Sequence, residues 1–276
     1  MKKSIIAIML LIAVVAGCFA LVGCDKEETK DVYTIGVQEG TTSLMYAECL
    51  KGTEVSSFTT FPLAAQAMVN GNVDYVMCDK ATAISMCNNI SGIKYIDIAL
   101  STEFYAIAMD KNQPELNASI NAILDAKSAE VQAIIDKYLA GDEANYVGVT
   151  SATKDVNNAA GQLVVATNAE FAPWEYKVGD QYYGIDMEIA KLIATELSLE
   201  LVIDDMAFES VISAVGNHGV DVSMSGITIT NERKEVVNFS KSYYTESIVL
   251  VCKADDASFA SAGTVVDILN VICKNK

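Results

Sequence analysis

Each half of this chain contains short apolar runs that predict buried strands, together with segments of helical spacing that predict helices. In the first half, three short apolar runs are bounded by polar or turn-forming residues, which is typical of buried strands. These runs cover residues 33–37, 73–78 and 107–109. Between the first two, residues 63–69 have helical spacing and are followed by Asn70-Gly71, a pair that commonly ends a helix.

Two longer helices are predicted next, followed by a stretch without periodicity. The first covers residues 114–126 and opens with proline at its first turn. The second covers residues 128–139, with Ser128 as the expected N-cap and Gly141 at its end. Residues 142–161 are rich in Asn, Ala, Thr, Gly and Asp and show neither helical nor strand periodicity. They are the best candidate for a linker.

The second half repeats the same kinds of element. Residues 163–167 predict a strand, residues 185–197 and 210–215 predict helices, and residues 220–224 predict a strand. A helix end, a glycine turn and then Val-Asp occur in both halves, at residues 70–74 and 217–221. Alternating strands and helices indicate an α/β fold with mostly parallel sheets, here in two lobes with a ligand cleft between them. Two independent domains remain an alternative.

The N-terminus has the pattern of an export signal. Lys2-Lys3 precede an apolar run over residues 5–23, and a polar stretch follows. Residues 21–24, Leu-Val-Gly-Cys, resemble a bacterial lipobox, which predicts a signal peptide over residues 1–23, lipidation of Cys24 and a tether over residues 24–31. Cys18 is a weaker lipidation candidate, and an uncleaved membrane anchor is the other alternative. The expected location is outside the cytoplasm, on the cell membrane.

Charge and cysteine content exclude some classes of function. The 276 residues contain 19 Lys+Arg and 36 Asp+Glu, a formal net charge of −17, with the basic residues scattered. A polyanion would be repelled, so nucleic-acid binding is not expected. The five cysteines that would remain after Cys18 and Cys24 are odd in number and widely spaced, which fits neither a disulfide framework nor a zinc site.

No familiar enzyme motif is present in the sequence. Glycine-rich phosphate loops, HExxH and GxSxG are all absent, and the single histidine, His218, lies in a predicted turn. We therefore expect no catalytic residues, no metal and no cofactor. The strongest chemical signal is instead at residues 224–233, where a strand ends in small and hydroxylated residues. Gly226 there offers an open carbonyl, Thr228 a hydroxyl, and Arg233 a fork that can hold a carboxylate.

A series of motifs in the second half is similar, in order and spacing, to lobe 1 of polar-amino-acid-binding proteins of ABC importers. These are type II periplasmic binding proteins, and they include the glutamine- and histidine-binding proteins. The motifs are Leu163-Val164-Val165-Ala166-Thr167, Phe171-Ala172-Pro173-Trp174-Glu175-Tyr176, Gly184-Ile185-Asp186, Gly226-Ile227-Thr228-Ile229-Thr230 with Glu232-Arg233, Asn238-Phe239-Ser240 and Tyr243-Tyr244. In the first half, residues 35–42 and Met77-Cys78-Asp79 resemble lobe 2 of the same family.

The resemblance implies how an amino acid would be held. Its carboxylate would bind Arg233 and the backbone of Thr228 and Thr42. Its ammonium would bind Asp79, the Thr228 hydroxyl and the Gly226 carbonyl. Such pairing would offset the free-energy cost of removing both charges of a zwitterion from water.

The side chain of the ligand is less clearly specified. The resemblance places Phe171 and Phe208 as walls of its pocket, and Gln38 and Cys78 are expected as neutral neighbours. Asn168 stands where relatives that bind basic amino acids carry an aspartate. A neutral polar ligand is therefore expected.

The two halves occur in the reverse of the family's order, which predicts a circular permutant. Lobe 2 would comprise residues 32–109 with 255–276, and lobe 1 with its hinge residues 162–254. Residues 110–141 would return to lobe 1, and residues 142–161 would join what are normally the free termini. Residues 105–110 and 247–253 would be the two hinge strands. A monomer is favoured, while a domain-swapped dimer or a remnant of tandem genes remains open.

The expected function is that of a lipid-anchored solute-binding protein. It would capture a free amino acid and deliver it to an ABC importer permease. The alternatives are a non-transporting amino-acid sensor and a dehydratase-like enzyme on the same fold.

Overall fold

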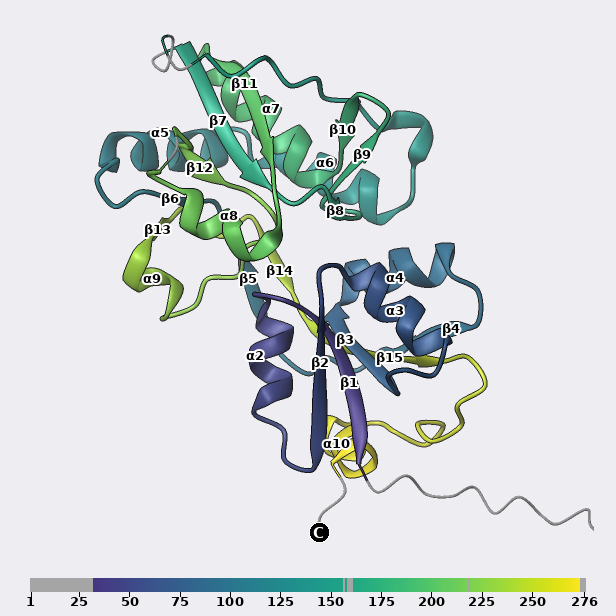
Figure 1. The fold of residues 1–276 in the computed structure, drawn as a ribbon. Coiled ribbons are helices and arrows are strands. Elements are labelled where there is room, and N and C mark those ends of the chain that lie inside the picture. Colours follow the sequence, from purple (N-terminus) through teal and green to yellow (C-terminus); the bar gives the residue numbers. More distant parts are fainter. Residues whose placement is uncertain (1–31, 156, 158–160, 218, 274–276) are drawn as a thin grey trace, which may run out of the picture. The chain divides into compact units, whose positions relative to one another are not determined.

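We describe the protein from a computed structural model that covers residues 32–155, 157, 161–217 and 219–273. The predicted signal peptide, the tether, Cys18, Cys24 and His218 lie outside these residues. Within them, no helix is long and apolar enough to cross a membrane. The fold is α/β, as predicted, and it is built on two five-stranded sheets (Figure 1).

The lobe 2 sheet is formed mainly by the first part of the chain, in the order β2-β1-β3-β15-β4. Its strands are β1 (Tyr33–Gln38), β2 (Thr53–Phe58), β3 (Tyr75–Asp79), β4 (Ile93–Ile96) and β15 (Ile248–Lys253). β1 is parallel to β2 and β3, whereas β15 runs antiparallel to β3 and β4. The sheet is therefore completed by a strand from the far end of the sequence.

Four helices belong to lobe 2, namely α2 (Thr42–Glu48), α3 (Phe61–Val69), α4 (Lys80–Asn89) and α10 (Val265–Ile272). The helix predicted over residues 63–69 corresponds to α3, which begins two residues earlier. It is capped by the Thr60 hydroxyl, which accepts a hydrogen bond from the Leu63 N–H, and its C-cap is Asn70. Gly71, with φ +81°, then turns the chain in a conformation that favours glycine.

The lobe 1 sheet has a similar plan, with the order β11-β7-β12-β6-β13. Its strands are β6 (Ala108–Met109), β7 (Gln162–Thr167), β11 (Glu200–Asp205), β12 (Val222–Ser223) and β13 (Asn238–Phe239). β7, β11 and β12 are parallel, while β6 lies antiparallel between β12 and β13. β6 lies within residues 32–109, which were assigned to lobe 2, but it pairs with strands of lobe 1. In the same way, β15 lies within residues 162–254, which were assigned to lobe 1 and its hinge, but it pairs with strands of lobe 2.

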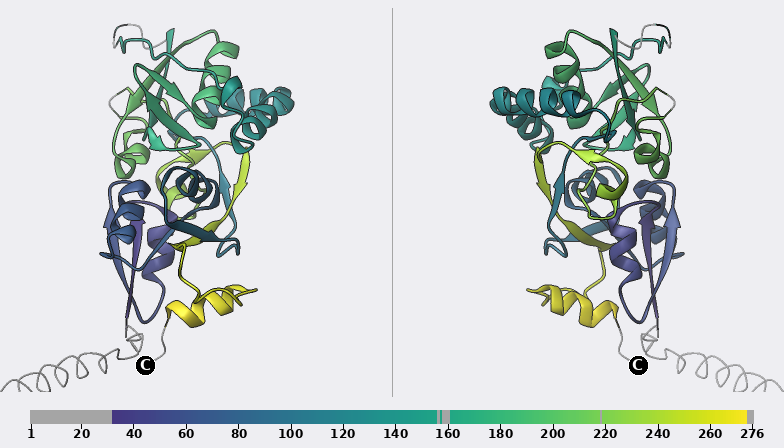
Figure 2. Two further views of the ribbon diagram at one scale, coloured as in Figure 1. Left: turned by 90° about the vertical axis from the view of Figure 1, so that its right-hand side faces the viewer. Right: turned by 90° about the vertical axis from the view of Figure 1, so that its left-hand side faces the viewer.

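Helices α5 (Pro114–Ala126) and α6 (Ser128–Leu139) pack against α7 (Ile185–Glu196) of lobe 1 (Figure 2). Lobe 1 also contains α8 (Phe208–Ala214), α9 (Arg233–Val236) and the small sheet of β8 (Glu170–Phe171), β9 (Glu175–Val178) and β10 (Gln181–Tyr183). The bounds of α5 and α6 are those predicted. The prediction that Ser128 caps α6 is wrong, because the N-cap is Lys127 and makes no side-chain capping bond.

Two strands connect the lobes. The chain leaves lobe 2 through β5 (Glu103–Tyr105) and returns through β14 (Tyr244–Glu246), which leads into β15. β5 and β14 pair antiparallel, with Glu246 opposite Glu103. We call β5 and β14 the crossing strands.

Residues 142–161 were predicted to lack regular structure, and those that the structure describes, 142–155, 157 and 161, lie along lobe 1. They contain a short 3-10 helix, Glu143–Asn145. Val149 exchanges backbone hydrogen bonds of 2.7 and 2.9 Å with Tyr182, and the Ala152 N–H donates to the Leu201 carbonyl at 2.8 Å. The segment is therefore held by the lobe along its described length.

Candidate amino-acid-binding site

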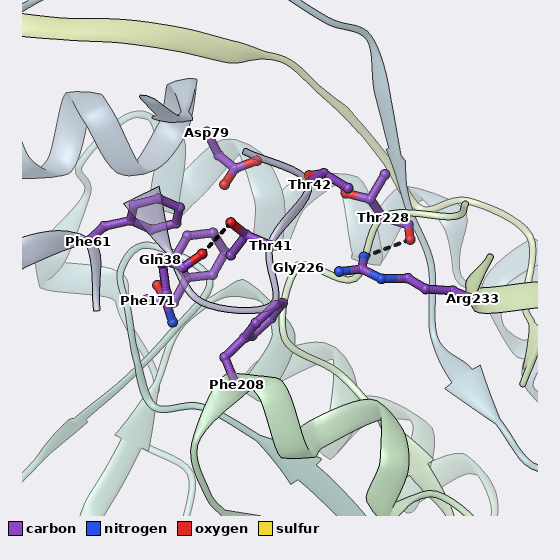
Figure 3. A pocket seen from close by; sticks show the side chains of 10 residues that line it. All are labelled: Gln38, Thr41, Thr42, Phe61, Asp79, Phe171, Phe208, Gly226, Thr228 and Arg233. Carbon is purple, nitrogen blue, oxygen red and sulfur yellow. Dashed lines mark hydrogen bonds between the residues drawn. The ribbon is translucent and has the colours of Figure 1, made fainter. Parts of the chain in front are cut away.

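A pocket lies where the loops of the two lobes meet (Figure 3). About 270 Å³ of empty space lies between its lining side chains and at its mouth. The lining residues are Gln38, Thr41, Thr42, Phe61, Asp79, Phe171, Phe208, Gly226, Thr228 and Arg233. This set includes every ligand-binding residue expected from the sequence except Asn168. It also lacks Cys78, which was expected as a pocket neighbour and is buried in lobe 2 instead.

The topology explains why these residues meet. Gln38 ends β1, Asp79 ends β3, and Gly226 and Thr228 follow β12. Loops at the carboxyl ends of strands in open α/β sheets are the usual place for a ligand site. Half of the lining residues come from each lobe, so neither lobe forms the pocket alone.

Arg233 is the only arginine in the chain, and it is buried, with 8% of its surface exposed. Its Nη1 donates to the Thr228 carbonyl at 2.9 Å, and its Nη2 donates to the Gly40 carbonyl of the other lobe at 3.0 Å. Among the described residues no carboxylate lies within ion-pairing distance of it. Burial lowers the pKa of Arg233, but a guanidinium remains charged at any physiological pH. A buried, unpaired cation is suited to receive an anion.

Asp79 supplies the opposite charge from lobe 2. It ends β3, is 5% exposed and lies at the N-terminus of α4. Burial, followed by repulsion from Glu103 and Glu246, raises its pKa well above the ordinary value. A cation in the pocket would relieve this repulsion.

Gly226 adopts a left-handed backbone conformation that favours glycine. Its φ is +55°, and a Cβ there would lie 2.7 Å from the Phe171 ring, so a larger residue would be strained and crowded. Its N–H donates to Asp186 Oδ2 at 2.8 Å, and Asp186 Oδ1 accepts a hydrogen bond from the Tyr243 hydroxyl at 2.7 Å. Burial raises the pKa of Asp186 to about 6. The sequence motif contained Asp186 and Tyr243 but gave no hint of this role.

The remaining wall is aromatic and neutral. Phe61 of lobe 2 faces Phe171 of lobe 1, with ring centroids 5.8 Å apart. Gln38 Nε2 donates to Asn168 Oδ1 at 3.1 Å. Asn168 in turn donates to the Met206 carbonyl at 3.0 Å, so it lies behind Gln38 rather than in the lining.

Two lining residues, Thr41 and Phe61, were not expected from the sequence. Thr41 donates to the Gln38 carbonyl at 2.7 Å and accepts from the Leu44 N–H, which makes it the N-cap of α2. The pair Thr41-Thr42 could have indicated the N-terminus of α2, a helix that was not predicted. Phe61 could not have been found, because it reaches the pocket only through packing between the lobes.

Within the described part of the chain, no group of three or more His, Cys, Asp or Glu side chains could hold a metal ion. The described cysteines, namely Cys49, Cys78, Cys87, Cys252 and Cys273, are free thiols.

Residues 163–275, from β7 to α10, match the bacterial extracellular solute-binding proteins, family 3. The arginine-binding extracellular protein ArtP of Bacillus subtilis is 43% identical over 94 residues, which are 34% of this chain and 37% of that protein. ABC transporter arginine-binding protein 1 of Escherichia coli is 29% identical over 99 residues, 36% of this chain and 41% of the relative. A probable histidine-binding protein of Neisseria gonorrhoeae is 33% identical over 96 residues, 34% of this chain and 36% of the relative.

The chain thus spans about two fifths of the length of these curated relatives. Among solved structures, the arginine-bound domain 1 of TmArgBP, a Phe57Trp mutant, matches 42% of this chain and 88% of its own, at 32% identity and a TM-score of 0.31. A ligand-binding component of an ABC-type import system from Staphylococcus aureus matches 88% of this chain and 71% of its own, at 12% identity and a TM-score of 0.45. By sequence, the part of the chain from β7 to α10 is similar to amino-acid-binding proteins of transport systems.

Proposed function

We propose that this protein is an extracytoplasmic solute-binding protein that captures a free amino acid between its lobes and delivers it to an ABC importer permease. The observation that carries the proposal is the placement of opposite charges. Arg233 of lobe 1 and Asp79 of lobe 2 are both buried and line the same pocket. An α-amino acid carries a carboxylate and an ammonium on one carbon, so it would satisfy both groups at once.

The remaining polar groups fit the same assignment. The ligand carboxylate binds Arg233 and the backbone N–H groups of Thr228 and Thr42. The ligand ammonium binds Asp79, the Thr228 hydroxyl and the Gly226 carbonyl. Because these groups belong to both lobes, the ligand favours the closed arrangement of the lobes over an open one.

A neutral polar side chain is the ligand class that the pocket favours. Asp79 is the only carboxylate among the described lining residues, and it is assigned to the ammonium. The amides of Gln38 and Asn168 bond to each other beside Phe171 and Phe208, which offers hydrogen bonds but no counter-charge. The names of the relatives support a second candidate class, cationic amino acids, since two of those relatives are named for arginine and one for histidine.

Circular permutation is part of the proposal, and two placements support it. Tyr33 at the start of β1 and Cys273 after α10 are partly buried and pack against the same apolar cluster of lobe 2. Helices α5 and α6 pack on lobe 1 before the chain enters β7. Joining residue 276 to residue 32 and opening the chain within residues 142–161 would give the usual family order.

Anchoring and assembly complete the proposal. Cys24 carries the lipid that holds the protein on the outer surface of the cell membrane, and the working form is a monomer. Globomycin, which blocks lipoprotein signal cleavage, is expected to cause accumulation of the uncleaved chain, and a Cys24→Ala variant is expected to lose lipid labelling. Normal processing of the Cys24→Ala variant together with labelling at Cys18 would reassign the anchor.

The function is tested by calorimetric titration. The full chain, held in detergent and refolded from denaturant to remove any co-purified ligand, is titrated with the twenty amino acids. We expect saturable binding of one or a few α-amino acids, with glutamine-like ligands ahead of arginine. Binding of arginine or histidine alone would replace the neutral ligand by the cationic class. A folded protein that binds none of the twenty would refute the proposal.

A further inference from the structure

A buried carboxylate on a crossing strand contacts the pocket from behind. Glu103, on β5, is 5% exposed and is not among the lining residues. Its Oε2 accepts a hydrogen bond from the Thr42 hydroxyl at 2.8 Å and another from the Thr228 hydroxyl at 2.7 Å. One oxygen therefore collects a hydroxyl from each lobe.

We propose that Glu103 is a positioning residue that turns both threonine hydroxyls into hydrogen-bond acceptors and so selects for the ammonium group of the ligand. The inference rests on the proposed function and deepens it, since it names the device behind recognition of one end of the ligand.

Each threonine hydroxyl has a single proton, and this limits what it can offer to the pocket. A threonine hydroxyl can donate one hydrogen bond and accept two, and its rotation is normally free. Donation to a carboxylate is charge-assisted and stronger than donation to a neutral group. While Glu103 holds both protons, Thr42 and Thr228 can offer only lone pairs to the pocket. A group that donates, such as an ammonium, is then favoured over one that only accepts.

The surroundings of Glu103 suit this role. Figure 3 shows the Thr42 and Thr228 side chains close together, between Asp79 and Arg233. Glu103 Oε1 accepts from the Ser101 hydroxyl at 3.4 Å, and no described basic side chain forms an ion pair with Glu103. The hydroxyl bonds are therefore its main polar partners. Because Glu103 sits on the strand that joins the lobes, it holds both threonines only when their loops are together.

The test compares amino acids with analogues that lack the α-ammonium. The full chain and its Glu103→Gln variant are titrated with L-glutamine and L-arginine, and with their deaminated forms, glutaramic acid and 5-guanidinopentanoic acid. Glutamine at position 103 keeps the size of the side chain but adds donors and removes the charge. We expect the Kd of the bound amino acid to rise at least roughly tenfold, while that of its deaminated form changes less than about threefold.

A second set of variants separates positioning from a simple charge effect. Thr228→Ser keeps the hydroxyl and is expected to keep the preference for the ammonium, whereas Thr228→Val is expected to lose it. In the Thr228→Val background, Glu103→Gln should have about half of its wild-type effect on the free energy of binding, because one of its two hydroxyl partners is gone. These threonine variants also test the proposal if Glu103→Gln fails to fold.

The outcomes distinguish the inference from the function on which it rests. Equal loss of affinity for the amino acid and its deaminated form in Glu103→Gln would overturn the inference and leave the function standing. The full Glu103→Gln effect in the Thr228→Val background would also overturn it. A folded wild-type protein that binds none of the four probes and none of the twenty amino acids would overturn both.

Discussion

The two lobes have the same plan but give the pocket opposite charges. In each, parallel strands are joined by an antiparallel strand that arrives from the other half of the chain, β15 in lobe 2 and β6 in lobe 1. Lobe 2 supplies the carboxylate of Asp79, and lobe 1 supplies the guanidinium of Arg233. Two lobes of the same plan can thus bring opposite charges to one pocket, and under the proposed function a zwitterion would use both.

The lobes also differ in how their acidic groups are compensated. In lobe 1 the buried Glu188 pairs with Lys137 at 2.6 Å and accepts from the Tyr138 hydroxyl and the Val147 N–H. It thereby fastens α6 and the segment after it to α7. The charged groups that most affect the pKa of Asp79 in lobe 2 are two other carboxylates, Glu103 and Glu246, and both raise it. Glu188 of lobe 1 thus holds helices together, whereas Asp79 of lobe 2 has the role of receiving the ligand ammonium in the proposed function.

The largest effect is expected from removing the lobe 1 charge. Arg233→Ala leaves the ligand carboxylate buried without a partner and should weaken binding by roughly 2–5 kcal/mol, about 30- to 5,000-fold in Kd. Calorimetric titration measures the change. Lys234→Ala, which removes the exposed neighbouring cation, is the matched control and should change Kd less than about twofold. Near-normal binding by Arg233→Ala would refute the site assignment.

The next effect concerns pH and the crossing strands. Burial raises the pKa of Glu246 from 4.5 to about 7, with Glu103 adding to the shift and Lys80 and the Ser247 and Ala81 N–H groups opposing it. The folded state therefore binds more protons than the unfolded state between these values, so this group lowers stability as pH rises from about 4.5 to 7. The loss is at most about 3 kcal/mol. Urea unfolding at several pH values should show that Glu246→Gln flattens this slope; an unchanged slope would contradict the assignment.

Removing the lobe 2 charge should separate stability from binding. Asp79→Asn ends the repulsion with Glu103 and Glu246, so the free protein should become more stable. The same change removes the partner of the ligand ammonium and should weaken binding by about 10- to 100-fold. Asp180→Asn, at an exposed turn, is the control for both measurements. A variant that loses stability as well as affinity would show that Asp79 is structural.

Binding should also depend on pH through Asp79. Its pKa is raised in the free protein, and a bound ammonium would lower it. Complex formation should therefore release protons, and affinity should rise with pH across the range in which Asp79 ionises. Calorimetry in buffers of different ionisation heat measures the release. Proton uptake would contradict the pairing of Asp79 with the ammonium.

The smallest effect is expected from reversing the order of the halves. A chain that runs from residue 161 to 276 and then from 32 to 155 keeps the segment that is hydrogen-bonded to lobe 1. It should fold with a loss of less than about 1 kcal/mol and bind within about threefold of the wild type. Unfolding curves and titration provide the test. A reversed chain that cannot fold would count against the permutation.

The sequence predicted most of what local pattern determines. The strands predicted over residues 33–37 and 73–78 correspond to β1 and β3, which each end one residue later. Helices α5 and α6 and the stretch around Arg233 also followed from periodicity, turn residues or motif resemblance. The sequence could not show Glu103 as a partner of Thr228, because 125 residues separate them and only the pairing of the lobes brings them together. Ser128 was misjudged as a cap because only Lys127 separates α5 from α6, which puts Ser128 inside the first turn.

One measurement tests most directly that the lobes hold opposite ends of one amino acid. The bound amino acid, its decarboxylated form and its deaminated form are titrated into wild type, Arg233→Ala and Asp79→Asn. Loss of the ligand carboxylate should weaken binding to wild type and Asp79→Asn but cost little further in Arg233→Ala, and loss of the ammonium should cost little further in Asp79→Asn. If both variants respond to the two analogues as the wild type does, then neither Arg233 nor Asp79 reads the end of the ligand assigned to it.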